Sequence, residues 1–291
     1  MRDVKGNSPA LRGTYGIRVN EAAWRAINAL KLPKFAHTVF WWFYRSLAIV
    51  IFLLLWEISA RLELANPVFL PPFSKVVLTL YKMALSGELA KHFIISAQRA
   101  LTGFSMGLLV GIPAGLIIGW FSKFEYFIDP LMQIFRNLSV LALLPVFMLL
   151  FGIGEFSKIA LIFWGVLWTL ILNTVAGVKS IDTQLVKAAR AMATPAPLLF
   201  ALVILPGAMP SIVTGIRISA TSSVLVLLAA EMLGANRGLG FAIHYYEGQV
   251  RIPQMYGMIV VLAILGLLIS YSLIALEKHV FRWRQKVGVG E

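Results

Sequence analysis

The chain has 291 residues, of which 59% are hydrophobic and only 13% are charged. Soluble domains carry about 25% charged residues, so this composition excludes an ordinary water-soluble protein and indicates one that lies in lipid. The absence of cysteine excludes disulfides and thiolate metal sites. The net charge of +13 fits either nucleic-acid binding or a charge bias across a membrane, and the placement of the charges decides between them.

Residues 1–34 are basic and lack the apolar segment of a secretory signal, and the cytosolic N-terminal region is expected to extend to residue 45. We expect a mobile tail up to about Val19. Residues 20–32 have apolar side chains at helical spacing, which predicts a short helix. This helix either lies on the inner membrane face or is an ordinary cytosolic helix. The membrane domain is expected to occupy residues 46–291.

Six stretches are each about as long and apolar as a crossing of the hydrocarbon core of roughly 30 Å requires. The third stretch carries Arg136, and the fifth carries Arg217 and Glu231. Charges inside a span indicate that the span faces the bundle interior. The predicted fold is therefore an all-α polytopic membrane protein with six transmembrane helices, at residues 46–64, 100–121, 129–153, 159–178, 209–233 and 255–276.

The Lys and Arg residues are distributed unequally between the two sides of these spans. Sixteen fall on the side that holds both termini, and seven fall on the other side. Cytosolic loops carry the excess of basic residues, so we predict that both termini are cytosolic. This bias explains the basic composition without nucleic acid.

Glycines recur at every fourth position of the second span, at residues 103, 107, 111, 115 and 119. A helix ridge without side chains allows another helix backbone to approach closely. On the predicted outer side, residues 66–72 form a proline-rich loop and residues 74–85 an amphipathic helix. The glycine-rich residues 234–240 are expected to form an external turn or gate element.

The loop between the fourth and fifth spans, residues 179–208, carries a spaced pattern. It reads Lys187-Ala188-Ala189, then Ala193 three residues later, then residues 203–206, Val-Ile-Leu-Pro. This pattern resembles the EAA loop of permeases from ATP-binding-cassette (ABC) importers, with the spacing kept throughout. Lys replaces the usual Glu at 187, Ala the usual Gly at 193, and Val the usual Ile at 203.

The resemblance extends over residues 66–282 and is specific to the nitrate/sulfonate/taurine permease family, which includes bicarbonate permeases. Segments that resemble this family are Phe69–Pro72, Arg136–Pro145, Asn173–Asp182, Val203–Ser211, Gly215–Arg217 and Ala230–Gly240. It implies the core of a type I ABC importer in the bacterial cytoplasmic (inner) membrane. It also implies a homodimer with its pathway on the twofold axis, and a small anionic solute delivered by an external binding protein.

In this family the loop forms a coupling helix that seats in a groove of a separate cytosolic ATPase. Residues 186–193 would be the seated element, with Lys187 and Arg190 positioned to pair with acidic groove residues. The chain contains no phosphate-binding loop, so ATP and Mg²⁺ are expected on the partner and no cofactor on this chain. The residues assigned to ATPase coupling are Asp182, Val186, Lys187, Ala188, Ala189, Arg190, Met192, Ala193, Thr194, Leu205, Pro206 and Gly207.

Polar residues inside spans are functional candidates because lipid disfavours them. We consider Arg136, Asn137, Asn173, Arg217 and Glu231 as candidates for the translocation pathway. Either arginine would attract an anion. The alternative is internal pairing, such as Arg217 with Glu231, or extension of the arginines toward the inner headgroups.

Two other classes of protein remain to be weighed. A secondary transporter or a channel without an ATPase partner would predict matched inverted halves, and the sequence shows none. A membrane enzyme would need clustered His, Asp or Glu, but the four histidines and 13 acidic residues are dispersed. The same dispersion argues against a metal site.

Overall fold

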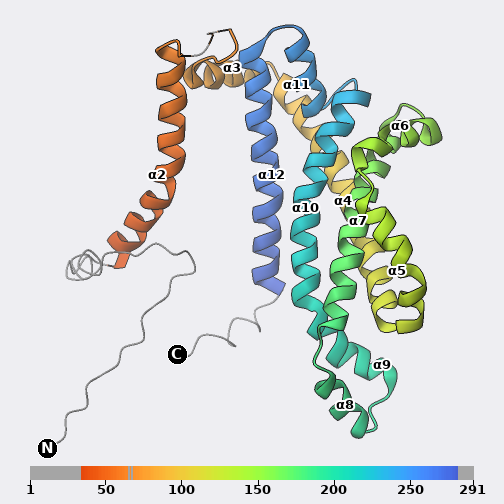
Figure 1. The fold of residues 1–291 in the computed structure, drawn as a ribbon. Helices are drawn as coiled ribbons and strands as arrows, with labels where there is room; N and C mark the ends of the chain where they lie inside the picture. The colour runs from red at the N-terminus through yellow and green to blue at the C-terminus, as the bar shows by residue number, and fades with distance from the viewer. Residues whose placement is uncertain (1–33, 65, 67, 281–291) are drawn as a thin grey trace, which may run out of the picture. The chain divides into compact units, whose positions relative to one another are not determined.

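The computed structural model describes residues 34–64, 66 and 68–280, and it places helices and no strands in that part of the chain (Figure 1). The chain divides into two units, residues 1–58 and 59–291. The first unit contains most of α2 (Lys34–Arg61), which overlaps the first predicted span. The helix predicted at residues 20–32 lies outside the described residues.

The second unit consists of helices joined by short connections. They are α3 (Phe73–Leu85), α4 (Glu88–Trp120), α5 (Ser122–Asn137), α6 (Val140–Phe151), α7 (Glu155–Lys179), α8 (Thr183–Ala191), α9 (Ala196–Leu199), the π-helix η1 (Phe200–Ile204), α10 (Leu205–Gly234), α11 (Leu239–Gly248) and α12 (Ile252–Val280). Helix α3 confirms the predicted amphipathic helix, because Val76 and Met83 are buried on one face.

Four helical runs within the described residues are long and apolar enough to cross a membrane: α4, α7, residues 196–234 and α12. They contain the second, fourth, fifth and sixth predicted spans. The pair α5 and α6 gives a fifth span only if the two are counted together. The described residues therefore supply four or five of the six predicted spans.

The third predicted span, residues 129–153, differs from the structure. Helices α5 and α6 meet at an angle of 97°. The break falls at Leu138 and Ser139, whose extended backbones have ψ of 127° and 118°. Pro130 and Pro145, which are the visible helix breakers, both lie inside helices. Hydropathy averages over such a break, so the apolar run looked like one continuous span.

The glycine ridge of α4 lies against α7, as its spacing predicted. A Cβ atom at Gly103 would lie 2.7 Å from Ile162, and one at Gly115 would lie 2.6 Å from Thr174. Real Cβ contacts are essentially never this short. The five glycines oppose five α7 residues that are also spaced by four, namely Ile162, Val166, Leu170, Thr174 and Val178. The two backbones therefore approach closely along most of their lengths.

Helix α7 is also packed closely on its other side, against α10. A Cβ at Gly177 would lie 2.8 Å from Ser211, and one at Gly215 would lie 2.7 Å from Asn173. Helix α7 thus lies between α4 and α10 at the centre of the second unit. The main apolar core gathers side chains of these three helices with those of α11 and α12.

The start of α10 continues from a π-helical turn. The amide of Leu205 donates to the carbonyl of Phe200, five residues earlier. Pro206 lacks an N–H, so it cannot make the α-helical bond to residue 202. In membrane helices, local π-turns are one way of accommodating the backbone bond that proline removes. Residues 203–206, the Val-Ile-Leu-Pro part of the predicted coupling pattern, therefore lie on this π-turn and on the beginning of α10.

Candidate functional site

Helix α8 and the turn after it form the predicted coupling element. The side chain of Asp182 caps α8 by accepting a hydrogen bond from the Gln184 amide at 2.8 Å. Ala193 has φ of +55°, a left-handed conformation that costs a non-glycine residue about 1–2 kcal/mol. The chain therefore turns through positive φ at the position where the family usually has glycine, with Thr194 and Pro195 following.

None of the α8 residues is buried within this chain. Leu185 is 58% exposed and Met192 is 80% exposed, and Ala188 between them is also exposed. These three residues, spaced i, i+3 and i+7, share one helix face. We call Leu185, Ala188 and Met192 the outer face of α8. Figure 1 shows α8 and α9 at the end of the bundle where α7 ends and α10 begins.

The side of α8 that carries Val186 turns toward the bundle. Val186 packs against the apolar cluster of Val178, Ile204, Ala208 and Ile212, and Ala189 is half-buried. Lys187 and Arg190 are exposed. Of the later coupling residues, Leu205 and Pro206 are half-buried at the start of α10, whereas Gly207 is exposed beside Ile181. Leu185 was missed in the sequence, although its spacing from Ala188 and Met192 is visible there.

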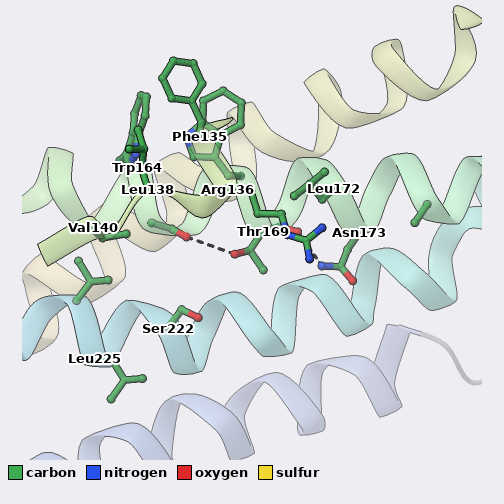
Figure 2. A pocket seen from close by; sticks show the side chains of 14 residues that line it. Phe135, Arg136, Leu138, Val140, Trp164, Thr169, Leu172, Asn173, Ser222 and Leu225 are labelled. Carbon is green, nitrogen blue, oxygen red and sulfur yellow. Dashed lines mark hydrogen bonds between the residues drawn. The ribbon is translucent and has the colours of Figure 1, made fainter. Parts of the chain in front are cut away.

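A cavity of about 580 Å³ opens where the α5–α6 break faces α7 and α10 (Figure 2). Arg136 and Asn173, two of the five predicted pathway residues, both line it. Figure 2 shows the Arg136 side chain extending toward Asn173. Arg136 is exposed and has no ion pair with a described residue, and no Asp or Glu lines the cavity. The cavity therefore carries one uncompensated positive charge.

Aromatic side chains form one wall of this cavity. The ring of Phe135 lies 5.0 Å from that of Trp164 and 4.7 Å from that of Trp168, measured between centroids. The indole nitrogens of both tryptophans are buried and have no acceptor among the described residues. Thr169 and Ser222 add hydroxyl groups to the lining. None of these residues is a candidate in the sequence analysis, although Trp164 and Trp168 share a face of α7 at i, i+4.

The other pathway candidates lie elsewhere. Asn137 is exposed and donates to the Gln133 carbonyl at 2.8 Å, outside the cavity lining. Arg217 pairs with Glu277 of α12. The pairing of Arg217 with Glu231, weighed above, is therefore wrong. The two residues are fourteen positions apart on α10, which places them about 21 Å apart along the axis.

Glu231 has no exposed surface and lies at the other end of α10. Its carboxylate accepts hydrogen bonds from Ser96 at 2.8 Å, from Arg99 at 2.7 Å and from the Gly240 amide at 2.9 Å. Arg99 also makes two bonds to Glu155, at 2.5 and 2.6 Å. This network joins α4, α7, α10 and α11. Arg99 was not assigned a role from sequence, since its partners are remote along the chain.

Comparison with known proteins identifies the architecture. Residues 107–286 match the family described as "Binding-protein-dependent transport system inner membrane component". A solved chain of the inward-facing MetNI methionine ABC transporter shares the fold, with a TM-score of 0.54 and 23% identity. That match covers 64% of this chain and 93% of the solved one.

Several relatives match over most of their lengths. The putative aliphatic sulfonates transport permease SsuC of Bacillus subtilis is 32% identical over 243 residues, which are 84% of this chain and 88% of the relative. The taurine transport system permease TauC of Escherichia coli is 32% identical and covers 82% and 89% of the two chains. SsuC of Escherichia coli is 36% identical and covers 78% and 87%. The chain belongs to the family of binding-protein-dependent ABC importer permeases, in its sulfonate/taurine branch.

Proposed function

We propose that two copies of this chain form the translocation pathway of an importer for a small oxyanion in the bacterial inner membrane. An external binding protein delivers the solute, and a separate cytosolic ATPase drives its passage. The observation that carries the proposal is the exposed position of α8. A pattern that resembles a coupling loop lies on a helix with no buried residue and an uncovered apolar face.

The outer face of α8 has the properties of a seat for another protein. Leu185 and Met192 are large apolar residues exposed to 58% and 80%, and Ala188 between them allows close approach. Exposed Lys187 and Arg190 lie further round the helix, on the side away from this face. A partner groove that encloses α8 would contact the apolar face and would pair acidic side chains with these two cations. Val186 and Ala189, which face the bundle, instead hold α8 in position.

A homodimer follows from the number of coupling elements. The described residues contain one such loop, whereas an ABC ATPase works as a pair of nucleotide-binding subunits. Two copies of the permease would offer one α8 to each ATPase subunit. ATP binding would bring the two α8 helices together and favour the outward-open state, because the ATPase pair binds that state more tightly. Hydrolysis on the partner would then reset the pathway.

The solute class is supported by the Arg136 cavity and by the relatives. Two of the similar permeases are named for aliphatic sulfonates and one for taurine. The cavity offers the Arg136 guanidinium, the Asn173 amide and the Ser222 hydroxyl as donors, and no carboxylate lines it. Donors of this kind suit an oxyanion. The proposed class comprises sulfonates including taurine, nitrate and bicarbonate.

The proposal is tested by placing an acidic residue on the outer face of α8. Ala188→Glu changes an exposed helix residue, so its effect on folding should stay within about 0.5 kcal/mol. An unpaired charge forced into an interface costs 2 kcal/mol or more. We therefore expect normal amounts of membrane-inserted protein and at least about a tenfold loss of ATPase in affinity purification, together with a severe loss of uptake.

The control is Gln249→Glu, an exposed position after α11 at the other end of the bundle. It adds the same charge and should leave ATPase association and uptake intact. Full association and full uptake in the Ala188→Glu variant would show that α8 is not the coupling element.

A further inference from the structure

A second cavity, of about 810 Å³, lies at the end of α7 opposite to α8. It opens between the first half of α4, the start of α7 and the turn between α10 and α11. Three basic residues line it, Arg99, Lys158 and Arg237, and one carboxylate does, that of Glu155. Asn236 adds an exposed amide at its edge.

Lys158 is buried in this wall without a hydrogen-bond acceptor among the described residues. Its side chain is 5% exposed, and its ammonium nitrogen lies 3.6 Å from the nearest oxygen of Glu155. That separation is too long for a hydrogen bond. Both oxygens of Glu155 already accept bonds from Arg99. The Lys158 ammonium lines the cavity and forms an ion pair with Glu155 but no hydrogen bond at this separation, so an anion in the cavity would supply acceptors for its three donors.

Arg237 supplies a second cation at the cavity mouth. Its backbone carbonyl accepts a hydrogen bond from Arg99 at 2.7 Å, which fixes the turn. Its side chain is exposed and has no ion pair with a described residue. The charge of Arg99 is neutralised by buried Glu231, whose Oε1 lies 2.7 Å from Nη1 of Arg99. The charge of Lys158 is neutralised by Glu155, which leaves the charge of Arg237 without a counterpart in the lining. The lining therefore keeps a net positive charge.

We propose that this cavity is a second binding site, for the oxyanion group of a small solute, formed by the Lys158 ammonium and the Arg237 guanidinium. A sulfonate or carboxylate would supply the acceptors that Lys158 lacks, in charge-assisted bonds. The site goes beyond the Arg136 cavity and is separate from it. Lys158 and Gly165 of that cavity are seven residues apart, two turns along one face of α7. In the proposed orientation, a solute meets the second cavity first.

The test uses the absence of native cysteine. Asn236→Cys is introduced into the full-length chain, and the rate of its reaction with N-ethylmaleimide is measured in detergent at constant ionic strength. Ethanesulfonate should slow the reaction in a saturable way, whereas ethylammonium should not. In the double variant with Lys158→Gln, the half-protecting concentration should rise at least about tenfold, because bonds to a charged group are lost. Arg237→Gln should raise it as well.

Two controls isolate the site. A cysteine at Gln249, exposed at the same end but outside the cavity lining, should react at a rate that ethanesulfonate does not change. Arg251→Gln removes another exposed cation from that end and should leave protection of Asn236→Cys intact. Absence of saturable protection, or protection unchanged by both Lys158→Gln and Arg237→Gln, would overturn the proposal. If Lys158→Gln fails to fold, the half-protecting concentration measured with Arg237→Gln, a change at an exposed residue, decides between the outcomes.

The detergent measurement requires neither an ATPase nor a membrane orientation. Its failure would leave the importer proposal standing, and failure of the α8 test would leave this site standing.

Discussion

Glu231 has no exposed surface, yet its carboxylate is surrounded by hydrogen-bond donors. Ser96, Arg99 and the Gly240 amide all bond to it, and the Leu239 amide bonds in turn to Ser96 at 2.7 Å. A buried charge is tolerated when it is paired and fully hydrogen-bonded. The carboxylate also excludes side chains from the turn beside it, since a Cβ at Gly238 would overlap Glu231. We infer that Glu231 holds the α10–α11 turn in place.

This structural role predicts that Glu231→Gln destabilises the protein severely. The amide nitrogen of glutamine cannot accept, so either Arg99 or the Gly240 amide loses its partner. Breaking a buried pair by removing one member costs about 3–5 kcal/mol. We expect a marked loss of monodisperse protein on heating in detergent, followed by size-exclusion chromatography.

The matched change is Glu277→Gln, which removes the partner of Arg217. The Arg217 and Glu277 side chains are 50% and 22% exposed, so this pair is less buried than the Glu231 network and its loss should cost less. Its thermal profile should stay close to that of the unchanged protein. Equal profiles for the two variants would contradict the role assigned to Glu231.

Individual residues were predicted unevenly from the sequence. Arg136 and Asn173 were named because polar residues in an apolar run stand out, and they share a cavity. The partner of Glu231 could not be read from the chain. Arg99 is 132 positions away, and only the packing of α4 on α10 and α11 brings the two together. Trp164 and Trp168 were overlooked because tryptophan is unremarkable in an apolar helix.

At the scale of elements, the contact of α4 with α7 depends on the absence of side chains on the glycine face of α4. Gly107→Ala adds a single methyl group, which would overlap the side chain of Val166. Neither backbone can move without disturbing the four other glycine contacts. Overpacking of this kind costs about 1–3 kcal/mol, so we expect a clearly lower apparent melting temperature in detergent.

Ser105→Thr is the control, since it adds one carbon atom at an exposed position of the same helix. A double variant, Gly107→Ala with Val166→Gly, adds a methyl group to α4 and removes the α7 side chain that this methyl group would overlap. It should be less destabilised than the sum of the two single changes. Strict additivity would mean that the close contact between α4 and α7 does not exist.

The lengths of elements were less predictable than their existence. Helix α4 begins at Glu88, twelve residues before the predicted second span, because it continues through polar residues that a hydropathy pattern does not count. The α5–α6 break was missed for the opposite reason. Leu138 and Ser139 turn the chain inside an apolar run, without a glycine or proline to mark the place. The break borders the Arg136 cavity.

At the scale of the whole molecule, the second unit has two chemically different ends. At one end α8 lies near the α4–α5 connection, where Lys179 pairs with Glu125. At the other end lie α3, α11 and the Glu231 network (Figure 1). The predicted cytosolic loop at residues 179–208 thus shares one end with residues 122–128, between the second and third predicted spans, and the predicted external turn at residues 234–240 lies at the other end.

This arrangement predicts which side of the membrane each end faces. Single cysteines are introduced at Ser180 and Asn236, which are both exposed and lie at opposite ends. The excess of Lys and Arg predicts that the Ser180 end faces the cytosol. An impermeant thiol reagent added to intact cells should label the cysteine at Asn236. It should label the cysteine at Ser180 only after the membrane is permeabilised, and because the chain has no native cysteine, any signal belongs to the introduced residue. Labelling at Ser180 in intact cells would place α8 outside, where no ATPase could reach it, and would exclude the coupling role of the outer face of α8.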